Sequence, residues 1–153
     1  AIDLRWAADP ELPSGRTRPG PGDQRFVIAP REDGAVVVRY VYVDPESTAE
    51  PIAFASPTGT EHVARVDRID AAKITIARRK NGYTLTASIP WSALGEPSQI
   101  GGLRRGDVGV VFGDASGSRV VRRCYYFDPG SQEVSDIPSE VRINPSQWGE
   151  FRF

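Results

Sequence analysis

The chain has 153 residues, of which 39% are apolar and 25% charged, and its 19 Lys plus Arg against 20 Asp plus Glu give a formal net charge of −1. This length suits one folded core, and the neutral balance lacks the positive field that nucleic acid or an anionic membrane would attract, so we expect neither partner. Fifteen Gly and thirteen Pro interrupt the sequence too often for long helices. We therefore predict a single all-β domain over residues 1–153.

Alternation of apolar and polar residues with a period of two predicts antiparallel strands along the chain. The run 35–43 is apolar on both faces, which predicts a central strand, covered on one side by a second sheet and on the other by loops. In chain order the predicted strands are Ile2–Ala7, Arg25–Ala29, Ala35–Val43, Ile52–Ala55, His62–Val66, Lys73–Arg78, Tyr83–Ile89, Asp107–Phe112, Arg119–Phe127 and Phe151–Phe153.

Asn, Asp, Gly and Pro mark the turns and loops between these strands. Lys73–Ile89 is predicted to be one hairpin that turns at Asn81-Gly82. Leu12–Asp23 contains three prolines and is predicted to be a long exposed loop. Pro90 presets the first φ of a helix, so one short helical turn is expected at Ser92–Leu94. The predicted fold is an antiparallel, jelly-roll-like β-sandwich.

Residues that could carry catalysis are sparse. The chain has one histidine, His62, and one cysteine, Cys124, which excludes a multi-histidine metal site, an intramolecular disulfide and a zinc site built from cysteines. No serine lies in a nucleophile-elbow pattern, and no Gly-rich stretch opens a helix that could bind phosphate. We therefore expect no catalytic residues and no enzymatic activity.

Four acids fall in the loop-rich C-terminal region: Asp128, Glu133, Asp136 and Glu140. A pair of carboxylates, as glycoside hydrolysis uses, is one interpretation, and solvated or capping acids in turns are the other. Loop carboxylates and carbonyls can also hold calcium, because this hard cation accepts scattered oxygen ligands. Calcium is the one cofactor considered, with no ligand set identified.

Aromatic residues beside Arg and amide side chains give a functional indication. Sugars stack the flat C–H faces of their rings on aromatic side chains, and fork-like or amide groups meet their hydroxyls. Trp148, in a turn-rich segment near the end of the chain, is the candidate platform, with Arg123 and Asn144 for the hydroxyls and Tyr125 at the border. In the alternative interpretation, Trp148 closes the bottom of the sandwich and the tyrosines pack in the core.

These motifs resemble a known family. The stretch 82–95, which contains Ile89-Pro90-Trp91, followed by 105–109 and 113–114, is similar to family 9 carbohydrate-binding modules and to the related DOMON-like β-sandwiches. The stretch 135–149, ending in Trp148-Gly149, looks like the end of such domains. The resemblance implies a non-catalytic module that binds an oligosaccharide or polysaccharide, often with calcium. It also implies attachment to a larger enzyme or surface protein that is secreted, periplasmic or on the cell surface.

The start of the chain departs from the family pattern, because Ala1–Leu4 matches a strand that lies inside such domains. The chain is therefore expected to belong to a longer protein, and the rest of that protein or a partner chain is expected to cover the N-terminal sheet edge. No stretch approaches the roughly 20 apolar residues that a membrane helix needs, so no membrane span is expected.

Two rival functions stay open at this point. One is a structural or protein-interaction sandwich without a sugar ligand. The other is a haem-binding redox domain of the DOMON type, which would need His62 with an unusual partner such as Lys73 or Lys80, because the chain has no Met.

Overall fold

The computed structural model of the chain describes residues 1–31, 34–95, 102–129, 138 and 141–152. Short strands dominate these residues, together with the four-residue helix α1 (Trp91–Leu94) and the 3₁₀ turn η1 (Pro145–Gln147). The strands are β1 (Ile2–Ala7), β2 (Asp23–Arg31), β3 (Gly34–Val41), β4 (Ile52–Ser56), β5 (Gly59–Val63), β6 (Arg65–Arg68), β7 (Lys73–Arg79), β8 (Gly82–Ser88), β9 (Leu103–Gly113), β10 (Val120–Tyr125) and β11 (Gly149–Arg152).

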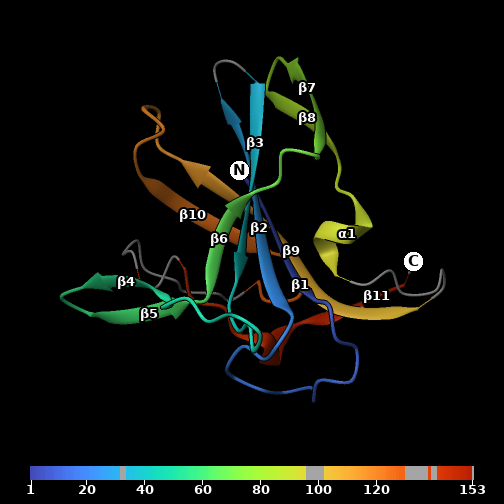
Figure 1. The fold of residues 1–153 in the computed structure, drawn as a ribbon. Coiled ribbons are helices and arrows are strands. Elements are labelled where there is room, and N and C mark those ends of the chain that lie inside the picture. The colour runs from blue at the N-terminus through green and yellow to red at the C-terminus, as the bar shows by residue number, and fades with distance from the viewer. Residues whose placement is uncertain (32–33, 96–101, 130–137, 139–140, 153) are drawn as a thin grey trace.

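One antiparallel sheet of seven strands forms the centre of the molecule (Figure 1). Its order is β10-β9-β1-β2-β3-β6, and β11 pairs with the first residues of β9. The strand β1 pairs with β2 on one edge and with β9 on the other. The prediction that the start of the chain leaves an uncovered sheet edge is therefore wrong for β1, because β9 returns beside it.

Two hairpins cover the two faces of this sheet. The β7–β8 hairpin and α1 lie on one side, and the β4–β5 hairpin lies on the other (Figure 1). The C-terminal segment 141–148 shares the side of β4–β5, because Val141, Ile143 and Trp148 pack in one cluster with Val63 of β5. The result is a layered, antiparallel all-β fold of the sandwich type, as the sequence predicts.

The side under β7–β8 is an ordinary apolar core, which we call the apolar face. Alternate residues of three neighbouring strands meet there, and register pairs Ile2 with Ile28, Leu4 with Phe26 and Ile28 with Val37. Ile74, Leu85 and Leu94 pack on them from the covering elements. The indole of Trp6 donates a hydrogen bond to the Leu94 carbonyl at 2.9 Å, which fixes α1 against the sheet.

Most predicted elements are confirmed, with small shifts of their bounds. The Lys73–Ile89 hairpin forms, but Arg79 pairs with Gly82, so Lys80 and Asn81 make the turn. The strand predicted over His62–Val66 is wrong. The chain bends at Ala64 and passes from the β4–β5 hairpin into β6 of the main sheet, so one apolar run supplies two strands.

Several predictions lie outside the described residues: the three acids Glu133, Asp136 and Glu140, the sequence pattern 135–137, and the last residue of the predicted strand at 151–153. Within the described part of the chain, no helix has the length and apolar character needed to cross a membrane.

Candidate functional site

The side of the sheet opposite the apolar face carries buried charged and phenolic side chains, which we call the polar face: Asp3 and Arg5 of β1, Arg25 of β2, Tyr42, Asp107 of β9 and Tyr125 of β10. All six are less than a tenth exposed. Period-two alternation explains their position, because Asp3 and Arg5 alternate with the apolar residues of β1.

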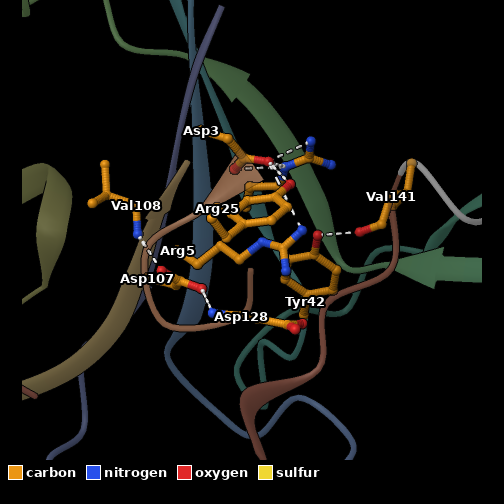
Figure 2. Close-up of polar contacts among 9 residues, drawn as sticks. Asp3, Arg5, Arg25, Tyr42, Asp107, Val108, Asp128 and Val141 are labelled. Atoms are coloured by element: carbon orange, nitrogen blue, oxygen red, sulfur yellow. Dashed lines mark hydrogen bonds and ion pairs between the residues drawn. The ribbon is translucent and has the colours of Figure 1, made fainter. Parts of the chain in front are cut away.

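Asp3 is the centre of this cluster (Figure 2). Both of its oxygens accept from Arg25 Nε at 3.0 Å, and Oδ2 lies 2.8 Å from Arg25 Nη2. Arg5 Nη2 lies 4.0 Å from the same oxygen. This is the fork geometry in which a guanidinium holds a carboxylate most strongly.

The arginines keep Asp3 ionised. Burial alone would raise the pKa of Asp3, but the charges of Arg25 and Arg5 and the hydrogen bonds from Arg25 and Tyr125 outweigh it, so its pKa lies below the ordinary value. Burial alone would lower the pKa of Arg25, and Asp3 reverses this effect and raises it. Burial raises the pKa of Tyr42, which stays a neutral phenol and donates to the Val141 carbonyl.

Tyr125 reaches Asp3 across β9 because a glycine lies between them. Gly109 is the register partner of both Asp3 and Tyr125, and a Cβ at this position would overlap the Tyr125 ring. The phenol donates to Asp3 Oδ2 at 2.7 Å, and the Arg5 guanidinium stacks 3.8 Å from the ring centroid. Three strands are thus tied together through one carboxylate.

Asp107, unlike Asp3, accepts hydrogen bonds from backbone N–H groups, two of which follow the end of β10. Its two oxygens accept backbone N–H bonds from Val108 and Asp128 at 2.8 and 3.2 Å (Figure 2). The Phe127 N–H donates to the same carboxylate at 3.0 Å. Burial raises the pKa of Asp107, and these donors offset only part of that effect. Asp107 therefore fixes the bend that follows β10.

The long loop between β1 and β2 is anchored by Asp23. This buried carboxylate accepts from Arg16 Nη2 at 2.6 and 2.8 Å and from the Gly20 N–H at 2.8 Å. Burial raises the pKa of Asp23, and Arg16 and the Gly20 N–H offset part of the rise. The predicted loop over Leu12–Asp23 is confirmed, since no strand begins before Asp23 and the residues before it are exposed or half-buried, while Asp23 itself is buried.

This anchored loop forms one wall of a polar cleft of about 590 Å³, which we call the loop cleft. Thr17, Arg18 and Pro19 line the loop side, and Tyr42 and Val43, which directly follow β3, also line the cleft. The opposite walls come from β5 and the C-terminal segment: Thr60, Glu61, His62, Arg142 and Ile143. Arg142 Nε donates to Glu61 Oε1 at 2.6 Å and joins these two walls.

The four residues predicted from the sequence to form a sugar site lie in different surroundings and differ in exposure. Trp148 is 8% exposed and packs with Ala7, Tyr42 and Ile143, so the prediction of an exposed stacking ring at the sandwich edge is wrong. The ring is buried because η1 turns it under the loop, where Arg16 lies 5.6 Å from its centroid.

Tyr125 is 5% exposed and bonded to Asp3, so it does not border an open site. Asn144 is exposed, and its side-chain oxygen accepts from the Ser146 N–H as the cap of η1. Arg123 is half-buried and lines a separate cavity with Arg25. The structure does not gather these four residues around one common cavity, and their role in ligand binding stays a prediction.

Sequence patterns could not single out the loop cleft. Arg18 and Thr17 lie in a loop, His62 on β5, and Arg142 near the end of the chain, so only the tertiary fold brings them together. The one available signal was the composition of residues 12–23, because a long loop without strands is often functional.

The described residues contain no group of three His, Cys, Asp or Glu side chains placed to hold a metal ion. Calcium also takes backbone carbonyls as ligands, so calcium as a possible cofactor stays a prediction. His62 is exposed on β5 and lines the loop cleft.

Comparison with protein-family models, with curated proteins and with solved structures finds no match for this chain. The class that the fold defines is therefore an antiparallel, sandwich-like all-β protein. The resemblance to family 9 carbohydrate-binding modules stays a hypothesis carried by the sequence motifs.

Proposed function

We propose that this chain is a non-catalytic carbohydrate-binding module and that its sugar site is the loop cleft. The cleft itself carries this proposal. Its volume of about 590 Å³ lies within the range of roughly 300–1,000 Å³ that small-molecule sites occupy. In this reading the module belongs to a larger enzyme or surface protein outside the cytoplasm, and an oligosaccharide or polysaccharide is its partner.

The chemistry of the lining suits a ligand rich in hydroxyl groups. Arg18 and Arg142 offer several N–H donors each, and Glu61 offers carboxylate acceptors. Thr17, Thr60 and His62 can both donate and accept. A hydroxyl needs one acceptor and one donor, so a mixed lining of this kind satisfies it better than a lining of a single charge.

The walls of the cleft are also held in place before a ligand arrives. The Asp23–Arg16 pair fixes the loop, the Glu61–Arg142 pair joins β5 to the C-terminal segment, and the Tyr42 hydroxyl bonds to the Val141 carbonyl. A preformed site loses less conformational entropy on binding, which raises affinity without new contacts.

The cleft lacks an exposed aromatic platform among its described lining residues, because Tyr42 is 8% exposed. Hydrogen bonds alone must then supply the affinity, and each is worth only about 0.5–1.5 kcal/mol net. We therefore expect dissociation constants in the range of about 10 μM to 1 mM.

A structural or protein-interaction sandwich is the second candidate, and a specific observation favours it. Trp148 and Tyr125, the two aromatic rings predicted to touch sugar, are both buried. A spacer domain needs no more than this packing. The two candidates differ in whether the loop cleft binds any glycan at all.

A glycan-array screen followed by calorimetric titration of the best glycan tests the proposal. Arg18→Ala should weaken binding at least about tenfold, because Arg18 is an exposed cleft residue whose loss leaves the core intact. The matched control is Arg79→Ala, an exposed arginine on the β7–β8 hairpin at the other side of the sheet. Arg79→Ala should bind like the parent protein.

Two results would reject this function. The first is an array on which no glycan binds the folded protein above background. The second is a glycan whose affinity falls equally in Arg18→Ala and Arg79→Ala, because the site would then lie elsewhere.

A further inference from the structure

A second cavity of about 310 Å³ opens on the polar side of the sheet, between β2, β9 and β10 below and Phe54 of β4 and Val141 above. We call it the arginine cavity, after Arg25 and Arg123 in its lining. None of its described lining residues also lines the loop cleft, so we treat it as a separate cavity.

The two arginines reach the cavity from different strands. Arg25 is almost fully buried, and its guanidinium is held by Asp3, which is itself held by the Tyr125 hydroxyl. Arg123 lies on β10 opposite Val111 of β9, and it is half-buried. No carboxylate lies among the described residues that line the cavity, so its charged groups are all cationic.

The rest of the lining is aromatic and apolar. The Tyr40 and Phe54 rings lie 6.2 Å apart between centroids and are tilted by 49°. The Arg25 guanidinium lies 5.7 Å from the Tyr40 centroid. Valine side chains from β2, β9, β10 and the C-terminal segment complete the walls. An apolar chamber with a few fixed polar groups is the usual form of a small-molecule site.

We infer that the arginine cavity binds a small molecule that carries a carboxylate on an apolar body. A guanidinium presents paired N–H donors that match the two oxygens of a carboxylate, and the surrounding apolar walls strengthen that attraction by excluding water. The rings and valines would then cover the apolar body.

Neither arginine has to be free of other contacts for this binding. A guanidinium has five N–H donors, so Arg25 can hold Asp3 through Nε and Nη2 and still donate to a ligand. The same count applies to Arg123. The fixed Asp3–Arg25 pair also holds the Arg25 side chain in position, so that little rotamer entropy is lost on binding.

The arginine cavity does not depend on the proposed sugar function, so it is tested with small carboxylic acids rather than with glycans. Benzoate and hexanoate test an aromatic and an aliphatic body, benzamide and hexanamide are their neutral counterparts, and acetate lacks an apolar body. Titrations of ¹⁵N-labelled protein are followed by amide shifts. We expect one or both of the larger acids to bind at least about tenfold more tightly than their amides and than acetate.

Arg123→Gln removes one of the two arginine cations. Arg122→Gln is its matched control, since Arg122 is the preceding residue of β10, is exposed and pairs with Phe112 on the opposite face. Arg123→Gln should weaken binding of the acid at least about tenfold, and Arg122→Gln should leave it unchanged. If Arg123→Gln does not fold, the amide shifts of the wild-type protein during titration with the acid locate the site instead. Shifts confined to Val111, Val120 and their neighbours support the arginine cavity.

Three results overturn this inference: equal binding of acid and amide, equal losses in the two variants, or no acid-induced shift around Val111 and Val120. None of them bears on the loop cleft. A failure of the sugar function would likewise leave the carboxylate titration intact.

Discussion

Asp3 shows most clearly how single residues hold this fold together. The fully buried carboxylate contacts Arg25, 22 positions away in the sequence, and Tyr125, 122 positions away. Removing one partner of a buried pair costs about 3–5 kcal/mol, because the remaining charge is left without compensation. The Asp3 carboxylate therefore contributes a large share of the stability of the polar face.

Asp3→Asn should lower the free energy of unfolding by about 3–5 kcal/mol at neutral pH. The matched control is Asp70→Asn, which removes an equally short ion pair, Arg68–Asp70 at 2.7 Å, on the exposed surface. Surface pairs contribute about 0–1 kcal/mol, so this control should hardly change stability. Urea unfolding followed by circular dichroism measures both. Equal losses in the two variants would contradict the buried network.

The same variant carries a pH signature. The pKa of Asp3 is lower in the folded protein than the value of about 3.9 in an unfolded chain. The unfolded state therefore binds more protons in that window, and the contribution of Asp3 is complete above about pH 4 and is lost as the pH falls through the folded pKa. The stability difference between parent and Asp3→Asn should shrink below pH 4. A difference that is constant with pH would refute an ionised Asp3.

Residue patterns in the sequence predict only half of this arrangement. Alternation in β1 correctly separates Ile2, Leu4 and Trp6 from Asp3 and Arg5. The same pattern is typical of a strand with one solvated face, whereas here both faces are buried. The partners of Asp3 come from strands far along the chain, and Gly109, which lets Tyr125 approach, gives no local sign of that function.

Among the elements, the C-terminal segment 141–148 is the one whose burial the sequence predicts least well. Its turn-rich composition suggests an exposed edge, but Val141, Ile143 and Trp148 are buried against the sheet. The segment thereby supplies one wall of the loop cleft, through Arg142 and Ile143. Its packing and the geometry of the cleft are consequently coupled.

Trp148→Ala should reduce the free energy of unfolding by about 3–5 kcal/mol, as the loss of a buried tryptophan typically does. Trp91→Ala is the matched control, because Trp91 is 43% exposed on α1. Its loss should cost clearly less. Thermal or urea unfolding measures the difference. If the two variants unfold at the same midpoint, Trp148 is exposed and its interpretation as a stacking platform returns.

Strand patterns predict the regular elements well and the change between layers poorly. Ile2–Ala7 matches β1, and the β7–β8 hairpin and α1 occur where Asn81-Gly82 and Pro90 indicate them. The break at Ala64 was missed because apolar residues continue through it, and periodicity does not report a change of sheet. At the bend, the Tyr42 carbonyl accepts from the Ala64 N–H at 3.3 Å.

At the scale of the whole molecule, the two sides of the central sheet differ in the residues that they bury. The side under β7–β8 and α1 is an apolar core. The other side, under β4–β5 and the C-terminal segment, holds the buried charges and both candidate sites. The resemblance to carbohydrate-binding modules suggested a function, and the fold relocates its proposed site from Trp148 to the loop cleft.

The measurement that tests the proposed function most directly is a map of amide shifts in the parent protein during titration with the best glycan from the array. The proposed site predicts that the largest shifts fall on Arg18, Thr60, His62 and Ile143, around the loop cleft, while the β7–β8 hairpin stays unchanged. Shifts centred on the exposed Tyr126 or on β7–β8, with the loop cleft unaffected, would contradict it.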